Sequence, residues 1–452
     1  MAVLLPVLVA CGGAPSATSS ATTAPAPAAT TAPAPAAGAT IADMPQNLRT
    51  DLKGQTIKFS GDAAGPSSDF EKKYAAAFEQ ITGIKVEVLQ GEQSATDRLA
   101  QYRQQLSAQS SDTDVYMIDV IWPGILADHA VDLANALQSQ HTDYFERIVK
   151  NNTVDGKLVG IPMFIGAGLL FYRSDLLKKY GFDKPPATWA ELEQMAQKIQ
   201  DGERAAGNPD FWGYVWQGAA YEGLTCDALE WQFSQGGGTI IESDGTITIN
   251  NANAIKAFER AKGWIGTISP PGVTTYKEEE ARGVWQAGNA AFMRNWGYAY
   301  ALGQATNSSI KDKLDVTILP KGDGADGQNA ATLGGWQIMV SKYSKHQEAA
   351  IEWAKFLTSP EIQKKRALEL SLEPTIASLY QDPDILKALP YYARYLPVFR
   401  DGAVARPSTV SADLYNDVSA AYFTAVNQVL TGQMDAKTAV ADLETKLKNI
   451  LK

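Results

Sequence analysis

The sequence predicts an α/β protein in which a parallel sheet carries helices on both faces. The first observation is an alternation of strand and helix patterns between residues 56 and 118. The second is a similar alternation that opens after Ile161-Pro162. Parallel strands need crossover connections, so the order β-α-β-α-β predicts parallel pairing. The roughly 400 residues of the body suit two or three domains with large cores.

The elements of the first region follow from hydrophobic periodicity. Ile84 to Val88 alternates apolar and polar residues as a strand does, and Val115 to Ile118 is a short apolar run typical of a buried strand. In chain order we expect a strand at Thr56–Phe59, a helix at Asp69–Ile81, a strand at Ile84–Val88, a helix at Thr96–Gln109 and a strand at Val115–Ile118.

The second region shows the same signals. Gly168 to Tyr172 is a predicted strand, and Ser174 can cap a helix that stops at Gly181. Thr188 and Glu191 form a predicted capping box. The helix after this box has one apolar face, made of Leu192, Met195, Ala196 and Ile199, which we expect to be core.

The first ten residues are almost all apolar and are followed by a cysteine. The run from Ala2 to Ala10 is too short to span a bilayer, and small residues lie near its end. This pattern is typical of a lipoprotein signal peptide, so we expect residues 1–10 to be removed and Cys11 to carry the lipid. No Lys or Arg precedes the run, which leaves open that Cys11 is a chance cysteine.

Residues 12–40 contain only Gly, Ala, Pro, Ser and Thr. A segment without large apolar side chains cannot offset its ordering entropy by burial, so residues 11–45 are predicted to be a disordered linker. No later segment of the sequence is long and apolar enough to cross a membrane. We therefore expect an extracytoplasmic protein, at the cell surface or in the periplasm, attached to the membrane only through Cys11.

Charge and cysteine content exclude several classes. The formal net charge is −10 with acids and bases interspersed, which argues against nucleic acid or an anionic membrane surface as the ligand. The two cysteines are Cys11 and Cys226, so lipidation of the first leaves the second without a disulfide partner. Cys226 is predicted to be a small buried apolar residue, although a reactive thiol is the alternative.

Catalytic signatures are sparse. None of the three histidines has a second metal-type ligand at helical spacing, and neither HExxH nor GxSxG occurs, so we predict no metal and no cofactor. Residues 322–327 match GxGxxG, but Pro320 ends the preceding strand and two aspartates would repel a pyrophosphate, which favours a flexible loop. Glu278-Glu279-Glu280 is read as a solvated helix turn. Paired glycosidase carboxylates stay open, because they need only be close in space.

Several longer stretches carry a resemblance to a known family. They are Ser111–Val120, Gly168–Leu177, Phe211–Gly218, Tyr221–Leu224, Gly288–Trp296 and Ala331–Trp336. From about Gln55 to the C-terminus, the chain resembles family 1 extracellular sugar-binding proteins of ABC importers, in particular the trehalose/maltose-binding type. The resemblance implies a two-lobed, periplasmic-binding-protein-like clamp of type II, with discontinuous lobes, a hinge and an interlobe ligand cleft.

The resemblance also implies the function of the protein, its ligand and its partner. It implies a monomeric receptor, not an enzyme, that captures a small carbohydrate and delivers it to the transmembrane subunits of an ABC permease. We expect chain crossings near Ile161, Ala330 and Ile362. Lobe 1 would then comprise residues 52–160 and 331–362, and lobe 2 residues 161–330 and 363–452.

The same resemblance nominates ligand-binding residues. Their types suit a sugar, because aromatic rings pack on the C–H faces of a sugar and charged groups form hydrogen bonds with its hydroxyls. The candidates are Trp296, Tyr298, Gly335, Trp336, Asp119, Arg98 and Arg406, with Asp69, Phe164, Gly166 and Tyr221 as weaker ones. The glycines beside the aromatic residues suggest strand ends or turns. The alternatives are core packing for the aromatics, a surface ion pair of Arg98 with Asp97, and a helix cap for Asp69.

Two positions depart from the trehalose/maltose-binding pattern. Phe164 and Gly166 stand where those relatives carry a Tyr and an Asp that contact a glucosyl unit. Each lost hydrogen bond is worth about 1–3 kcal/mol, enough to change the preferred sugar. We therefore expect a disaccharide or related glycoside but not trehalose or maltose in particular. A receptor for a non-sugar solute and, more remotely, a secreted glycosidase are the alternatives.

Overall fold

The computed structural model describes residues 41–63, 65–140, 143–397 and 403–452. All of them belong to one compact unit, Ala32–Lys452. The predicted signal peptide, Cys11 and most of the predicted linker lie outside the described residues. At the described end of that linker, η1 (Ile41–Asp43) is a 3-10 turn, and Met44 is buried in the core beside the first sheet.

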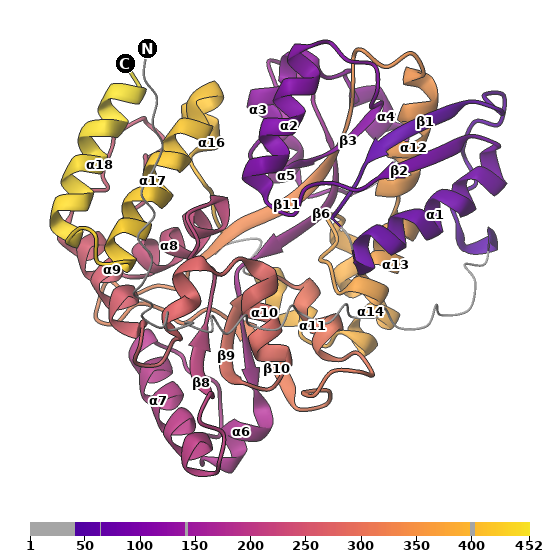
Figure 1. Ribbon diagram of the computed structural model, residues 1–452. Coiled ribbons are helices and arrows are strands. Elements are labelled where there is room, and N and C mark those ends of the chain that lie inside the picture. Colours follow the sequence, from indigo (N-terminus) through magenta and orange to yellow (C-terminus); the bar gives the residue numbers. More distant parts are fainter. Residues whose placement is uncertain (1–40, 64, 141–142, 398–402) are drawn as a thin grey trace, which may run out of the picture. The chain divides into compact units, whose positions relative to one another are not determined.

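Six strands form the first sheet (Figure 1). They are β1 (Thr56–Ser60), β2 (Lys85–Leu89), β3 (Val115–Asp119), β6 (Ile161–Ala167), β11 (Ala331–Val340) and β12 (Ala403–Val404). β1 lies between β2 and β3 and pairs with both in parallel, which confirms the predicted parallel unit. β11 runs antiparallel to β3 and β6. The sheet is therefore mixed, because strands from far along the chain extend the parallel unit.

Helices cover both faces of this sheet. Val115 and Met117 of β3 belong to one apolar cluster, while Tyr116 and Ile118 belong to another. Burial on both faces explains why this strand is apolar throughout. The helices are α1 (Pro66–Thr82), α2 (Ala95–Ser107), α3 (Pro123–Leu126), α4 (Ala134–Gln138), α5 (Glu146–Asn151), α12 (Gln347–Thr358) and α13 (Pro360–Leu370).

The second sheet has four strands in the order β10-β7-β9-β8. They are β7 (Leu169–Arg173), β8 (Trp212–Val215), β9 (Ala290–Asn295) and β10 (Leu314–Ile318). β7 confirms the strand predicted at Gly168–Tyr172, and it is buried throughout. Around this sheet lie α6 (Ser174–Lys179), α7 (Trp189–Ala205), α8 (Glu222–Ser234), α9 (Ala252–Trp264), α10 (Glu278–Gln286), α11 (Tyr298–Gly303), α17 (Tyr415–Leu430) and α18 (Ala436–Ile450).

Of the two predicted helix caps in this region, one is confirmed and one is wrong. The Thr188 hydroxyl caps α7 by accepting a hydrogen bond from the Glu191 backbone N–H at 3.1 Å, but the Glu191 carboxylate accepts from the Ala187 N–H rather than from Thr188, so the reciprocal bond of the predicted capping box is displaced by one residue. Ser174 caps nothing, because β7 runs to Arg173 and α6 begins directly at Ser174. A strand that passes straight into a helix leaves no free residue for a side-chain cap.

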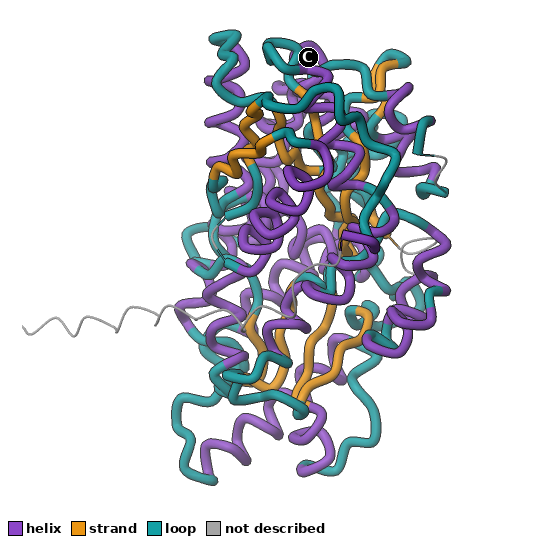
Figure 2. The backbone as a smooth tube through the Cα atoms, turned by 90° about the vertical axis from the view of Figure 1, so that its right-hand side faces the viewer, coloured by secondary structure: helices purple, strands orange, loops and turns teal. Residues whose placement is uncertain are grey.

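The C-terminal helices return to the second sheet although they follow it by many residues. Val418 and Tyr422 of α17 share one apolar cluster with Leu224 and Ala228 of α8. Figure 2 shows the strands in two groups, with helices around each. The shorter elements are η2 (Ala127–His129), β4 (Thr153–Val154), β5 (Lys157–Leu158), η3 (Pro271–Thr275), η4 (Ala377–Gln381), α14 (Pro383–Ala388), α15 (Tyr392–Pro397), α16 (Ser408–Ser411) and η6 (Ala412–Leu414).

Two strands link the sheets, and we call the first sheet with its helices the first lobe and the second sheet with its helices the second lobe. β6 ends at Ala167 and, after Gly168, the chain enters β7 of the second sheet. β10 of the second sheet is followed, after the longer connection 319–330, by β11 of the first sheet. β6 and β11 begin at Ile161 and Ala331, where we predicted crossings, and they pair with each other along the first sheet. The predicted lobe boundaries stay a prediction.

Candidate ligand-binding site

Three candidate aromatic residues come from the second lobe. Trp296 directly follows β9, Tyr298 is the first residue of α11, and Tyr221 directly precedes α8. Trp296 and Tyr298 are half-buried, whereas Tyr221 is 5 % exposed. The expected strand end is confirmed for Trp296, while Tyr298 starts a helix.

Two glutamates of α10 hold the polar ends of these aromatic residues. The Tyr221 hydroxyl donates to Glu278 Oε2 at 2.6 Å, and the Trp296 indole N–H points to Glu278 Oε1 at 3.5 Å. The Tyr298 hydroxyl donates to Glu279 Oε1 at 2.7 Å. Burial, with the nearby Glu278 and Glu279 charges, raises the pKa of both tyrosines well above its usual value. The predicted helix turn is confirmed and Glu280 is exposed, but Glu278 and Glu279 are only part-exposed and also hold the aromatic residues, which their local sequence did not indicate.

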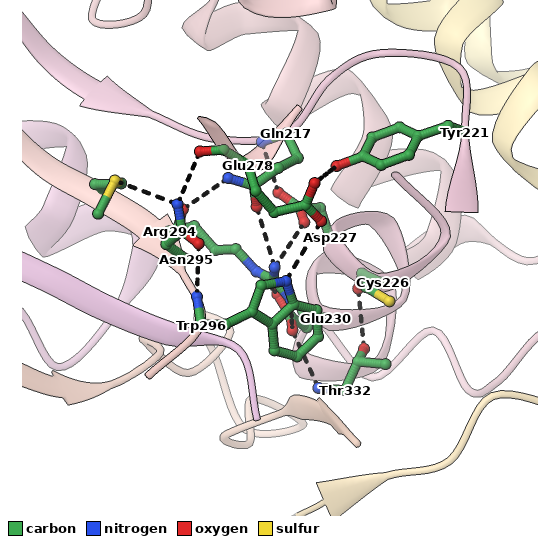
Figure 3. Close-up of polar contacts among 11 residues, drawn as sticks. Gln217, Tyr221, Cys226, Asp227, Glu230, Glu278, Arg294, Asn295, Trp296 and Thr332 are labelled. Carbon is green, nitrogen blue, oxygen red and sulfur yellow. Dashed lines mark hydrogen bonds and ion pairs between the residues drawn. The ribbon is translucent and has the colours of Figure 1, made fainter. Parts of the chain in front are cut away.

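A buried charge network lies beneath Trp296 (Figure 3). The Arg294 guanidinium lies 4.1 Å from the Trp296 ring centroid, a cation–π distance. Arg294 is fully buried and pairs with Glu230 at 2.6 Å and Asp227 at 3.3 Å. It also donates to the Gln217 side chain at 3.0 Å. These fixed partners keep the guanidinium under one face of the indole.

Arg98 and Trp336 form the first-lobe part of the site. Arg98 is 1 % exposed, and its guanidinium lies 4.6 Å from the Trp336 ring centroid. It donates to Asp62 at 3.2 Å and to the Glu92 carbonyl at 2.6 Å. The alternative of a surface pair with Asp97 is therefore wrong, because the side chain turns inward. Its Nη1 is buried and has no hydrogen-bond partner among the described residues.

Asp119 and Arg406 connect the two lobes. Asp119 ends β3, as predicted, and accepts from Arg406 Nη2 at 3.0 Å. Arg406 Nη1 donates to Glu222 of α8 at 2.8 Å. The Glu222 carboxylate also accepts from the hydroxyls of Tyr415 and Ser419. Burial raises the pKa of Glu222 above its usual value, and the charge of Arg406 opposes this shift.

The first turns of α2 and α8 also meet at this place. The Glu222 backbone N–H donates to the Thr96 hydroxyl of α2 at 3.3 Å. Thr96, Trp122, Glu222 and Tyr415 line a small pocket beside this contact. Sequence reasoning missed Glu222 and Tyr415. Glu222 lies in a stretch that carried the resemblance, which was the available signal.

The paired strands β6 and β11 carry the remaining candidates. Phe164 lies opposite Trp336, and Gly166 lies opposite Gly334. A Cβ at Gly334 would lie 2.9 Å from Trp296 Cζ3, so the missing side chain admits the indole. Gly335 has φ +136 and a β-bulge follows at Trp336. The expectation of a strand end or turn is therefore wrong here, since these residues lie inside β11.

Asp69 is the one candidate that the structure does not bring to this group. It is exposed in the first turn of α1. It does not cap the helix either, because α1 begins at Pro66 with Gly65 as the N-cap. Pro is favoured at the first position of a helix, which moves the helix start ahead of the predicted Asp69.

The described residues offer little for other chemistry. Within them, no cluster of three or more His, Cys, Asp or Glu side chains is arranged to hold a metal ion. Across the same ranges, no helix has the length and apolarity that spanning a membrane requires. The Gly322 to Gly327 loop packs on the end of α8, where Gly322 N–H donates to the Ser234 carbonyl at 3.1 Å.

Comparison with known proteins identifies the family. Residues 64–364 match the family model of the bacterial extracellular solute-binding proteins. The chain belongs to this family. The probable ABC transporter-binding protein of Deinococcus radiodurans is 51 % identical over 396 residues, which cover 87 % of this chain and 93 % of that protein. The arabinooligosaccharide-binding protein of Bacillus subtilis is 25 % identical over 277 residues, 60 % of each chain.

Solved structures of this family have the same fold. The chain matches maltose-bound MalE3 of T. maritima with a TM-score of 0.83 and 37 % identity, over 88 % of this chain and all of that one. A ribitol-bound solute-binding protein from Agrobacterium radiobacter matches with a TM-score of 0.76 and 23 % identity, over 88 % and 99 % of the two chains. The two-lobed α/β fold inferred from the sequence is confirmed.

Proposed function

We propose that this chain is the substrate-binding protein of an ABC importer and that it binds a small carbohydrate, a disaccharide or related glycoside, between its lobes. The observation that carries this proposal is the convergence of part-exposed Trp296, Tyr298 and Trp336 with buried Arg98 and Arg406. Rings pack on the C–H faces of a pyranose, and guanidinium groups donate to its hydroxyl oxygens. Both kinds of group meet here.

The proposed mechanism is closure of a clamp without chemical conversion of the ligand. β6 and β11 would serve as hinge strands, and the predicted crossing near Ile362 would be the third link. The bridge from Asp119 through Arg406 to Glu222 and the contact from Glu222 to Thr96 join the lobes in the present arrangement. A ligand that adds contacts only in this arrangement shifts the population towards it.

We further propose an extracytoplasmic protein that acts as a monomer, anchored through lipidated Cys11, with the transmembrane subunits of an ABC permease as partner. The family description as extracellular supports the location. The relative in Deinococcus radiodurans is named an ABC transporter-binding protein, which supports the partner. The maltose in the related structure supports the ligand class.

The test is a thermal-shift screen of the purified full chain with monosaccharides, disaccharides, glycosyl-polyols and charged solutes, followed by calorimetric titration. A ligand that binds only the native state raises the melting temperature with its occupancy. A rise with one or a few sugars, with the sugar recovered intact, is the expected result. If only a charged solute raises the melting temperature, the ligand is a non-sugar solute and the carbohydrate assignment is wrong. Hydrolysis of the sugar would favour a glycosidase.

A further inference from the structure

The three aromatic residues of the second lobe come from separate elements but share one support. Tyr221 precedes α8, Trp296 follows β9 and Tyr298 begins α11. Their hydroxyl or indole groups all point to Glu278 or Glu279 in the first turn of α10. Three independent side chains therefore depend on two neighbouring carboxylates for the direction of their polar ends.

The two carboxylates are held in place by the residues around them. Arg282, one turn further along α10, donates to Glu279 from two of its nitrogens. The Asn295 side chain, which directly precedes Trp296, donates to the Glu278 carbonyl at 3.1 Å. The positive end of the helix dipole also favours negative charge at this position. The support is therefore connected to the strand that presents Trp296.

Hydrogen bonding leaves the two sides of the site with different chemistry. The donors of Tyr221, Trp296 and Tyr298 are directed to glutamates, so these residues leave their ring surfaces rather than their polar ends for a ligand, beside the part-exposed Glu279 carboxylate. On the other side, Arg98 Nη1 and Arg406 Nε are buried N–H groups without a partner among the described residues. These two N–H groups therefore have no competing acceptor among the described residues and can donate to a hydroxyl oxygen of a ligand that reaches them.

We propose that Glu278 and Glu279 are positioning residues that fix the rings of Tyr221, Trp296 and Tyr298. The second-lobe wall then contacts the C–H face of the ligand, and the hydroxyl pattern is read by Arg98 and Arg406. This inference rests on the proposed function. The wall then contributes affinity through the C–H face that the ligand presents to it, and the arginines bond hydroxyls at the edge of the sugar ring.

The first experiment needs no ligand. The full chain is labelled with 5-fluorotryptophan, and the ¹⁹F resonance of Trp296 among the ten tryptophans is assigned with W296F. E278A should shift or broaden this resonance, and E278Q, which keeps one acceptor oxygen, should restore part of it. The matched control is E361A, which removes an exposed first-turn glutamate from α13. An unchanged Trp296 resonance in E278A would overturn the positioning role.

The second experiment measures Kd for maltose and for the C4 epimers glucose and galactose in wild type, E278A, E278Q, E279A, E279Q and Y298F. E278A and E279A should raise the Kd of each sugar that binds measurably by about tenfold. This is the loss expected when a ring contact is misplaced. E278Q and E279Q, which keep one acceptor oxygen, should recover part of this loss. Y298F keeps the ring and removes only the hydroxyl that donates to Glu279, so its loss should be smaller. A Kd in both E278A and E279A within about twofold of the wild-type value would overturn the inference.

The two experiments separate this inference from the proposed function. If wild type binds none of these sugars and none in the wider screen, the carbohydrate assignment fails. The ¹⁹F result still decides whether Glu278 holds Trp296. If wild type binds sugar and E278A binds it equally well, the assignment stands and the positioning role fails.

Discussion

Replacing Arg406 by leucine should destabilise the chain because two buried carboxylates lose their shared cation. The Arg406 side chain is 2 % exposed and pairs with Asp119 at 3.0 Å and Glu222 at 2.8 Å. Asp119 and Glu222 are themselves 7 % and 8 % exposed. R406L keeps an apolar side chain at the site and removes both ion pairs.

The size of the effect follows from what each carboxylate retains. At a charge separation of about 4 Å and an effective dielectric constant of about 20, each pair has a gross attraction of about 4 kcal/mol, which desolvation partly offsets. Glu222 keeps two hydroxyl donors, and Asp119 keeps the Ile121 N–H. Removing one partner of a buried pair costs about 3–5 kcal/mol, so we expect the free energy of unfolding to fall by about 4 kcal/mol.

The assay is urea unfolding without sugar at pH 7, followed by tryptophan fluorescence and circular dichroism. R49A is the matched control, because Arg49 forms ion pairs with exposed Asp51 and Glu348 and should leave the midpoint nearly unchanged. A loss in R406L as small as in R49A would refute the reasoning. It would mean that solvent replaces Arg406 readily, and hence that the contact between the lobes is open in solution.

Three further predictions address other parts of the fold. Burial raises the pKa of Glu373 from 4.5 to about 8, so the folded chain keeps this proton to a higher pH than the unfolded chain. The stability it contributes is present below pH 4.5 and is lost as the pH rises towards 8, and E373Q should remove this loss, on the order of 4 kcal/mol, from unfolding curves measured across that range. G335A should cost at least about 2 kcal/mol in the same assay, because φ is +136 and the new Cβ would lie 2.6 Å from the Phe164 carbonyl. G263A, in α9 with open space around its Cα, is its control and should stabilise slightly. In a C11A background, Cys226 should react with Ellman's reagent only after unfolding, because it is buried and burial raises the pKa of its thiol. Rapid reaction of the folded chain would contradict this burial.

Local sequence patterns predicted some elements of the fold, including β3, which carries Asp119. The apolar run Val115 to Ile118 predicted β3, because both faces of that strand are buried. Thr188 predicted the start of α7 because its capping hydrogen bond joins residues only three apart. Ser174 failed as a cap since the preceding strand, held by its partners in the sheet, leaves no gap before the helix.

The candidate site was predictable in part. The resemblance nominated Arg98, Asp119, Trp296, Trp336 and Arg406, and the structure brings them together. It did not nominate Glu222, Glu278 or Glu279. These residues act on partners far away in sequence, such as Glu222 on Arg406 across 184 positions. A short run of glutamates on a helix has the same local pattern whether it faces water or three aromatic rings.

By itself, the sequence determined the α/β class, the parallel β1–β3 unit and, through its resemblance, the family and the kind of site. Those properties depend on periodicity and on motifs, which are contained in neighbouring residues. Only the tertiary structure decided the pairing of β6 with β11, the inward turn of Arg98, the shared use of Arg406 by Asp119 and Glu222, and the position of Glu278 and Glu279 against the rings. Each of these is a long-range contact. The energy of such a contact depends on which polar and charged groups are removed from water together, and the packing of the whole chain determines which groups these are.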